Sequence, residues 1–295
     1  GDVYKRQASE ALTGKQAAKR RHYIALAKLK YRTDCGKGRF SIKEGVFIMA
    51  RENSITLVGE VSKVPVVFFN EEHQNYRMAF VMKTVRRNGR IDYPHVNVYG
   101  LTEQEAKDYF KALQIGRFLM VRGMVTTKMV PKKFRCDNCG VITECESLIT
   151  EVISYGRLVC LEGKYEALAL AEFANNLSVI GAVCTDVIGR ESGSGVSLTQ
   201  YQIAINRKYR VKEHDGVIKS DYPWIKSFGS QADEDLKHLR KSSQVYIAGA
   251  LQTREMSRFV ICDNCSARLD YTESVAEIVP QDVEYLFNCV FDESV

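Results

Sequence analysis

The sequence contains no long apolar run. No segment approaches the length needed to cross a bilayer, and none has the layout of a signal peptide. The signatures of phosphate-loop enzymes, zinc proteases and serine hydrolases are missing as well, and the five histidines are scattered along the chain. We therefore expect a soluble, cytoplasmic protein that is not an enzyme.

Most of the chain also lacks a basic balance, although the overall net charge is +6. Residues 1–48 hold 12 Lys and Arg against 4 Asp and Glu, which leaves 30 against 32 for residues 49–295. Net charge therefore gives no argument for nucleic-acid binding, and only local clusters of cations can supply one.

Residues 1–48 differ from the rest in a second respect. The letters DVYKRQ near the start are the in-frame translation of an adapter used in library preparation. Lys43-Glu44-Gly45 likewise translates a ribosome-binding sequence, a few codons before Met49. We expect this segment to be non-native or upstream read-through, with Met49 as the true start. The alternative is a genuine basic extension that acts as a flexible nucleic-acid arm.

What the sequence does contain is an internal duplication. The motif CDNC occurs at 136–139 and again at 262–265, and four upstream blocks recur in the same order before each copy. The offset between copies stays between 122 and 129 residues, so length changes fall between the blocks. We predict two copies of one domain. The expected segments are 49–156 for the first domain, 157–174 for a helical linker, 175–288 for the second domain and 289–295 for a short C-terminal end.

Within each copy, apolar residues alternate with polar ones, which indicates strands with one buried face. The strands expected in the first copy are 55–61, 78–82, 96–100, one that begins at 118–125 and runs toward the cysteines, and a final one near 148–153. After the third strand the period lengthens to three or four behind Thr102 and Glu105, which resemble a helix N-cap and its capping-box partner. This order is that of a five-stranded Greek-key barrel of the oligonucleotide-binding (OB) type. The predicted fold is mainly β, with two tandem OB barrels, each with one short helix between strands 3 and 4.

Three stretches of the first copy carry a resemblance to a known family. NSITLVGEV, GRFLMVRGMVTTK and ITEVI resemble bacterial-type single-stranded-DNA-binding proteins, more clearly over residues 53–154 than over 175–280. The resemblance implies barrels that stack bases on aromatic rings, contact phosphates through Lys and Arg, and assemble as four barrels around DNA. A chain with two barrels would reach four as a homodimer. A nucleoid-associated role in DNA replication, recombination or repair is also implied.

Cations interleaved with aromatics recur at the turn after the second strand of each copy. Cations neutralise phosphates and each ring offers a face to any base, so we expect sequence-tolerant binding that weakens with salt. The candidate residues are Lys83, Arg86, Arg87, Arg90, Tyr93 and His95 in the first copy, and Arg207, Lys208, Tyr209, Arg210, Tyr222 and Trp224 in the second. The competing interpretation is a turn that is charged because it is solvated, with Tyr93 and Tyr222 packed in the core.

The CxxC pairs are candidate metal ligands. Nine cysteines without a secretory signal suit metal ligation or free thiols better than disulfides. A structural zinc site takes four ligands, and each pair supplies two. Cys145 is a candidate third ligand in the first copy. Pooling the pairs Cys136, Cys139 and Cys262, Cys265 would instead make one site between the barrels. Zinc, reduced structural thiols and a redox dithiol all remain open.

An alternative function is an RNA-binding or primosome-type adaptor, which would use the same barrels. A preference for RNA would favour it.

The C-terminus differs from that of the resembling family. That family usually ends in a flexible tail with an acidic tip, whereas this chain stops shortly after Phe291. Either the sequence is truncated or the protein is a phage or mobile-element variant, and protein partners recruited through such a tail are not expected.

Overall fold

The computed structural model describes residues 51–162, 167–207 and 220–291. The segment 1–48 lies outside the described residues, as do the candidate residues Lys208, Tyr209 and Arg210. The first half contains β1 (Asn53–Val61), β2 (Val66–Asn70), β3 (Asn75–Val85), β4 (Ile91–Asp92), β5 (His95–Leu101), α2 (Glu103–Ala112), β6 (Phe118–Arg135), β7 (Ile142–Ser154) and β8 (Val159–Cys160). The second contains η1 (Ala167–Leu170), β9 (Asn175–Val183), β10 (Ile188–Glu191), β11 (Ser197–Asn206), β12 (Ser220–Asp221), β13 (Trp224–Phe228), α4 (Ser230–His238), β14 (Gln244–Ile261) and β15 (Arg268–Phe287).

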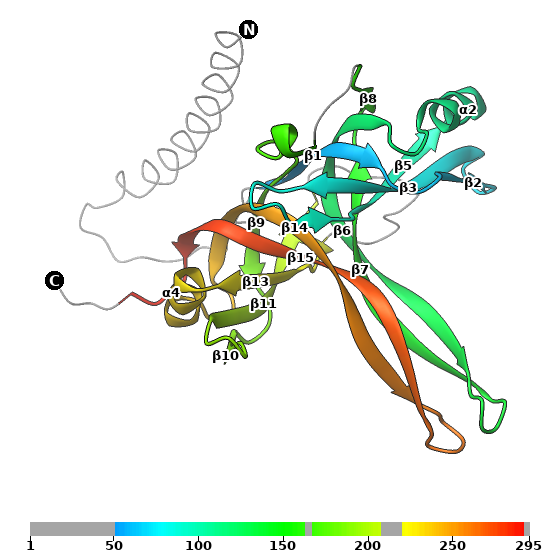
Figure 1. Ribbon diagram of the computed structural model, residues 1–295. Coiled ribbons are helices and arrows are strands. Elements are labelled where there is room, and N and C mark those ends of the chain that lie inside the picture. The colour runs from blue at the N-terminus through cyan, green and yellow to red at the C-terminus, as the bar shows by residue number, and fades with distance from the viewer. Residues whose placement is uncertain (1–50, 163–166, 208–219, 292–295) are drawn as a thin grey trace, which may run out of the picture. The chain divides into compact units, whose positions relative to one another are not determined.

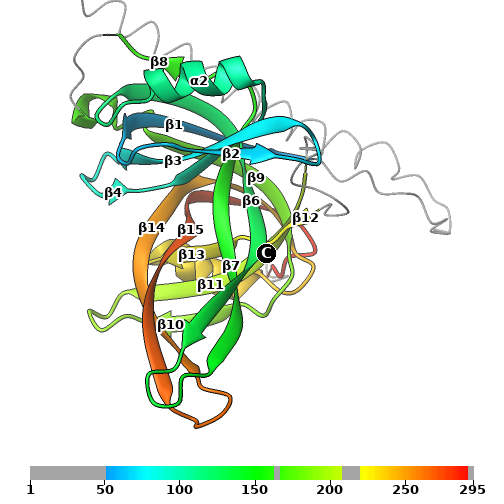
Figure 2. The same cartoon turned by 90° about the vertical axis from the view of Figure 1, so that its right-hand side faces the viewer.

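Each half closes into a barrel (Figures 1 and 2). In the first half the strands pair in the cycle β1–β3–β5–β7–β6–β1, in which β5 and β7 are parallel with Val96 opposite Val152. In the second half the cycle is β9–β11–β13–β15–β14–β9, and the parallel pair places Ile225 opposite Ile278. Two tandem five-stranded barrels are therefore confirmed as the fold.

The core of each barrel is built by the alternation seen in the sequence. In β1 the buried side chains include Ile55, Leu57 and Val61, and in β9 they include Leu177 and Val179. A Cβ atom at Gly59 would overlap the carbonyl oxygen of Lys83 on β3, and one at Gly181 would overlap that of Ala204 on β11. Glycine at these two equivalent positions therefore allows the first strand of each barrel to cross its neighbour closely.

The two barrels share one continuous sheet. The outer edge of β1 pairs antiparallel with β9, from Asn53 opposite Val179 to Leu57 opposite Asn175. Ile55 lies opposite Leu177 at the centre of this contact, and next to this pair the hydroxyl groups of Ser54 and Ser178 lie 2.9 Å apart. The first strand of one barrel therefore meets the first strand of the other in an approximately two-fold arrangement.

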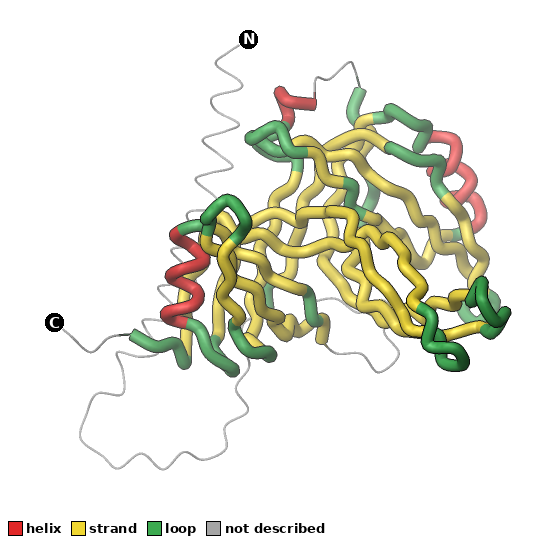
Figure 3. The backbone as a smooth tube through the Cα atoms, turned by 60° about the horizontal axis from the view of Figure 1, so that its bottom comes forward, coloured by secondary structure: helices red, strands yellow, loops and turns green. Residues whose placement is uncertain are grey.

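The helices lie at the outer ends of the barrels (Figure 3). Helix α2 begins where expected, because the Thr102 hydroxyl accepts a hydrogen bond from the Glu105 N–H and the Glu105 carboxylate accepts one from the Thr102 N–H. Of the stretch expected to be a linker, the described residues hold β8 and the single turn η1. Among the described residues there is no helix of sufficient length and apolarity to span a membrane.

Strands 4 and 5 of each barrel are longer than the sequence pattern indicated. We expected the fourth strand of the first copy to begin at 118–125 and run toward the cysteines, and the fifth to lie near 148–153, but β7 already starts at Ile142 and pairs with β6 as far as Arg135. We call residues 127–150 arm 1 and the equivalent residues 253–276 arm 2. The arms project side by side from the barrels, green and orange in Figures 1 and 2. Both faces of an arm carry polar residues, so the alternation that marked the barrel strands is weak there.

Candidate nucleic-acid interface and metal centre

Two of the candidate arginines are buried in ion pairs. The Arg86 guanidinium lies 2.7 Å from the Asp92 carboxylate. In the second barrel Arg207 binds Asp221 through two contacts, of 2.7 and 2.8 Å, and its side chain is only 3% exposed. Burial raises the pKa of Asp92, although the Thr253 amide and Arg86 act in the opposite direction. Each ion pair joins the end of the second barrel strand to the segment just before the third, so Arg86 and Arg207 are engaged in structural contacts and a phosphate would compete with Asp92 or Asp221 for them.

Each of these aspartates also binds the opposite barrel. The Thr253 N–H on β14 donates to Asp92 at 2.9 Å, and the Thr127 N–H on β6 donates to Asp221 at 2.7 Å. The threonine hydroxyls complete the contact, because the N–H of Tyr93 donates to Thr253 and that of Tyr222 donates to Thr127. The segments 92–93 and 221–222 are thus each docked on the root of the other barrel's arm.

This docking leaves the two candidate tyrosines at the surface. Tyr93 is 43% exposed and Tyr222 is 45% exposed. The alternative interpretation, in which both pack in the core, is therefore wrong. Their backbone positions are fixed by hydrogen bonds to the opposite barrel, which holds the rings in place without covering them.

The remaining described candidates differ in their exposure and in whether they form ion pairs. The ammonium group of Lys83 lies 2.7 Å from the Glu60 carboxylate, a contact that raises the pKa of Lys83. Arg87 pairs with Glu172 but is 72% exposed. Arg90 and His95 are exposed, and Trp224 is half-buried at the start of β13. Arg87, Arg90 and His95 are therefore accessible to solvent, whereas Arg86 and Arg207 are held in structural ion pairs.

The structure also brings together an aromatic cluster that we did not predict. On the outer face of the first barrel, the Arg77 guanidinium lies 4.4 Å from the ring centre of Phe68 and 5.8 Å from that of Tyr99. Phe68 on β2 lies directly opposite Arg77 on β3. The available signal was the run VVFFN, which holds two phenylalanines in an exposed edge strand. The second barrel has a smaller counterpart, in which Lys226 lies 5.8 Å from the ring centre of Phe228.

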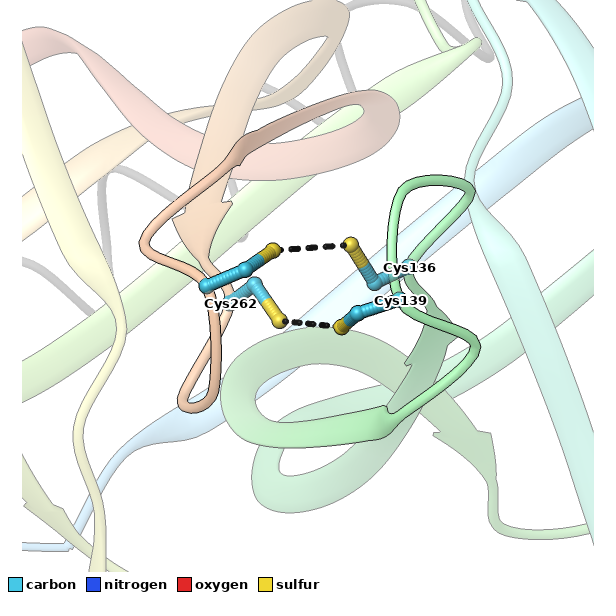
Figure 4. A group of neighbouring side chains, drawn as sticks. Cys136, Cys139 and Cys262 are labelled. Carbon is cyan, nitrogen blue, oxygen red and sulfur yellow. Dashed lines mark hydrogen bonds between the residues drawn. The ribbon is translucent and has the colours of Figure 1, made fainter.

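Four cysteines meet at the tips of the arms (Figure 4). The sulfur atoms of Cys136 and Cys265 lie 3.5 Å apart, as do those of Cys139 and Cys262, and all four lie within 4.8 Å of one another. A tetrahedral zinc ion with Zn–S bonds of about 2.3 Å separates its sulfur ligands by about 3.8 Å. The four thiols therefore match the geometry of one metal site shared between the barrels.

The two tips form the same turn. The N–H of Cys136 donates to the Val141 carbonyl at 2.9 Å, and the N–H of Cys262 donates to the Ala267 carbonyl at 2.8 Å. The residue after the second cysteine is left-handed in both, with φ of 75° at Gly140 and 57° at Ser266. Each CxxC pair is thereby folded back so that both of its sulfur atoms point to the opposite tip.

The local electrostatics distinguish the four thiols. Backbone N–H groups of Cys265 and Asn264 lower the pKa of Cys262 to about 6. The Ala267 N–H acts to lower the pKa of Cys265, but interactions with Cys136 and Cys139 outweigh it and raise this pKa to about 12. Neighbouring thiolates repel one another, so complete ionisation of the group calls for a cation.

Cys145 does not join this group. It lies on β7 opposite Lys132, away from the tip, and the four-sulfur set closes without it. The expectation that Cys145 supplies a third ligand to a site within the first copy is therefore wrong. The arms place the second CxxC pair at the position that a local third and fourth ligand would have filled.

Comparisons with known proteins agree with this fold. A model of the single-strand binding protein family matches residues 174–282, which cover most of the second barrel and its arm. We expected the clearer resemblance in the first barrel. Single-stranded DNA-binding protein 1 of Chlorobaculum tepidum is 31% identical over 119 residues, which are 40% of this chain and 67% of that protein.

Two solved structures of the single-stranded DNA binding protein from Thermus aquaticus are also similar. The wild-type protein has a TM-score of 0.54 at 14% identity, covering 83% of this chain and 98% of that one. A deletion mutant has a TM-score of 0.55 at 13% identity, covering 82% and 98%. At such identities the likeness shows a common fold. Together with the Chlorobaculum relative and the matched family model, it leads to one conclusion: the chain belongs to the single-strand binding protein family.

Proposed function

We propose that this protein binds single-stranded DNA without sequence preference and covers it during replication, recombination or repair. The observation that carries the proposal is the pair of ring-and-cation groups on equivalent outer faces, Phe68–Arg77–Tyr99 and Lys226–Phe228, in which Phe68 and Phe228 are exposed and the other three side chains are half-buried. Relatives in the family are named for single-stranded DNA binding, which supports the same activity here. Binding rather than catalysis is the proposed activity.

The proposed contacts combine stacking and charge. Exposed rings would stack on bases, each worth about 1–3 kcal/mol, and exposed cations would neutralise phosphates. The proposed set keeps Lys83, Arg87, Arg90, Tyr93, His95, Tyr222 and Trp224, and adds Phe68, Arg77, Tyr99, Lys226 and Phe228. Lys208, Tyr209 and Arg210 remain candidates outside the described residues. Since Arg77 already lies against two rings, a base entering there would extend an existing stack.

The test uses the single tryptophan of the chain, Trp224. Its fluorescence is followed during titration with oligo-dT at several salt concentrations. We expect quenching that saturates, and an affinity that falls steeply as salt rises. Tighter binding of oligo-rU than of oligo-dT would support the RNA-binding adaptor instead, and equal binding of double-stranded DNA would contradict single-strand recognition.

We also propose that the four tip cysteines bind one zinc ion per chain. The support is geometric, since the sulfur atoms of Cys136, Cys139, Cys262 and Cys265 are spaced as a tetrahedral zinc site requires. Structural zinc sites contribute about 10–16 kcal/mol of apparent binding free energy at neutral pH. Elemental analysis of protein purified without added metal, before and after treatment with a thiol-specific mercurial, measures the stoichiometry. A value near zero in reduced protein would contradict the proposal.

Assembly and location complete the proposal. A homodimer would provide four barrels, and we propose a cytoplasmic protein associated with the nucleoid. Sedimentation equilibrium over a hundredfold concentration range separates a dimer from a monomer. A mass of one chain throughout would contradict the four-barrel assembly and leave the binding activity to the two barrels alone.

A further inference from the structure

The two arms touch along much of their length. Below the cysteines, the Phe134 ring of arm 1 lies 4.6 Å from the Tyr271 ring of arm 2. Closer to the barrels, Lys132 of arm 1 binds Glu273 of arm 2, which is also paired with Arg258 of its own arm. Near the tip the Asp263 N–H donates to the Thr143 hydroxyl at 3.2 Å. The arms therefore form one composite element, closed at its end by the four sulfur atoms.

These contacts alone are weak. An isolated two-stranded hairpin is marginal in water, and the Lys132–Glu273 ion pair gives little because Lys132 remains partly exposed. The ring pair and the single hydroxyl contact are similarly small. A metal ion bound by two thiolates from each arm would be far stronger than any of these described contacts and would hold the tips together.

The roots of the arms bind the segments that carry the two candidate tyrosines of the opposite barrels. Thr127, at the root of arm 1, binds the backbone of Tyr222 and the side chain of Asp221. Thr253, at the root of arm 2, binds Tyr93 and Asp92 in the same way. Nine strand positions separate Thr127 from Cys136, or about 30 Å at 3.3 Å per residue. Each arm thus connects the cysteine cluster at its tip to a candidate stacking residue, Tyr93 or Tyr222, at its root.

We infer that the cysteine cluster is a zinc clasp that couples the two barrels: by joining the arm tips it holds both arm roots, and with them Tyr93 and Tyr222, in the arrangement that binds one DNA strand across both barrels. The inference rests on the proposed function and adds to it a means of control. Loss of zinc frees the arms from each other while the barrels stay joined by β1 and β9.

A shared clasp makes a prediction that two separate sites do not. Removing either CxxC pair, as Cys136→Ser/Cys139→Ser or as Cys262→Ser/Cys265→Ser, breaks the same site, so the fourfold variant should show no further loss. We expect each pair variant to bind no zinc and to bind oligo-dT roughly tenfold more weakly, because rigidly linked modules bind with a higher effective concentration than loosely linked ones. Cys145→Ser and Cys184→Ser, outside the cluster, are the matched controls.

The experiment combines three measurements on each variant: zinc per chain, Kd for oligo-dT, and hydrogen exchange of the arm and barrel amides. We expect faster exchange in both arms and unchanged exchange in β1 and β9. Wild-type protein that holds zinc but fails to bind oligo-dT refutes the proposed function, and the arm exchange then still reports on the clasp.

Three results overturn the clasp. The first is a pair variant that keeps a stoichiometric zinc ion, which means separate sites. The second is a zinc-free variant whose arms exchange as slowly as in the wild type. The third is a zinc-free variant that binds oligo-dT as tightly as the controls do. If a pair variant fails to fold, chelation of zinc from the wild type and its re-addition gives the same three measurements.

Discussion

The two barrels contain the same buried polar contacts but anchor their helices in different ways. In both, the side chain of an asparagine at the start of the first strand hydrogen-bonds to the backbone of the fourth strand. Asn53 makes two such bonds to Val125 and Asn175 makes two to Leu251, all of 2.8–2.9 Å. Both also contain the buried arginine–aspartate pair and its threonine partner. What repeats is a set of buried polar side chains that satisfies backbone groups within each barrel and between the two.

The helices show where change was tolerated. Helix α2 begins at Thr102 with a capping box, whereas α4 begins after Gly229 without a side-chain cap. In compensation, α4 contributes the buried Asp235, which accepts hydrogen bonds from Tyr201, Ser227 and Tyr285. The first barrel has Ala106 at the equivalent position. Helix α2 is therefore anchored by its N-terminal cap, whereas α4 is anchored by the hydrogen bonds of the buried Asp235 side chain.

The outer faces differ too. The first barrel presents two rings on either side of Arg77, while β10 of the second barrel reads Ile-Gly-Arg-Glu and offers no ring. Residues 49–156 also have 15 Lys and Arg against 12 Asp and Glu, compared with 15 against 20 from residue 157 onward. We therefore propose that the first barrel contributes more to both stacking and phosphate contact.

The largest expected effect tests the shared buried polar contacts. Asp221→Ala removes the carboxylate that binds the buried Arg207 guanidinium through two contacts, which should cost about 3–5 kcal/mol of the free energy of unfolding. Asp92→Ala should cost less, because the Arg86 side chain is 13% exposed and can reach water. Urea unfolding measures both, with Asp108→Ala on the exposed face of α2 as a control expected within about 0.5 kcal/mol. Equal losses in the two barrels would contradict the ranking.

The next effect concerns the outer faces. Phe68→Ala removes one ring of the first barrel's cluster and should weaken oligo-dT binding by about 1–3 kcal/mol. Phe228→Ala should weaken it less, since only Lys226 accompanies that ring. Fluorescence titration at constant salt compares the two variants with Phe110→Ala, an exposed phenylalanine on α2. A greater loss for Phe228→Ala would reverse the proposed dominance of the first barrel.

A smaller expected effect is a pH dependence of stability that arises in the second barrel. Burial raises the pKa of Asp235, although its hydroxyl and amide partners lower it. The folded state therefore holds the Asp235 proton to higher pH than the unfolded state does. As a result, the contribution of Asp235 to the free energy of unfolding falls as pH rises from about 3.8 through the folded pKa, by up to about 1.4 kcal/mol per pH unit. Asp235→Asn should remove that slope from the unfolding free energy. An identical pH profile in wild type and variant argues against a perturbed carboxyl group.

The smallest effect tests the helix ends. Thr102→Ala deletes the cap of α2 and should lower stability by about 1 kcal/mol. Gln231→Ala, at the corresponding position within α4, should leave the helix start unaffected, because no side chain caps it. Thermal unfolding followed by circular dichroism compares the two, and a larger shift for Gln231→Ala would mean that the Asp235 network outweighs the cap.

Much of the fold could be predicted because local rules govern it. Period-two alternation identified the barrel strands, and Thr102 with Glu105 identified the start of α2. The edge strand β2 was missed because its short apolar run does not alternate. The fourth strand was expected to run toward the cysteines, but its pairing along the whole arm was not predicted, because polar residues cover both faces and no alternation records the pairing of Arg135 with Ile142.

The candidate site was harder to predict because its decisive contacts join distant segments. Sequence alone cannot distinguish Arg86, buried against Asp92, from Arg87, which points to solvent one residue later. The four cysteines were identified, but their union depends on the path of two arms from different barrels. Phe68 and Arg77 meet through strand register, which a single sequence does not reveal.

The pairing of β1 with β9 has an evolutionary consequence. In an assembly of identical subunits, every substitution appears on both sides of the symmetry axis at once. Here the axis runs through a single polypeptide, so each side can mutate alone, and dilution cannot separate the partners. One half is then free to specialise while the other preserves the ancestral task.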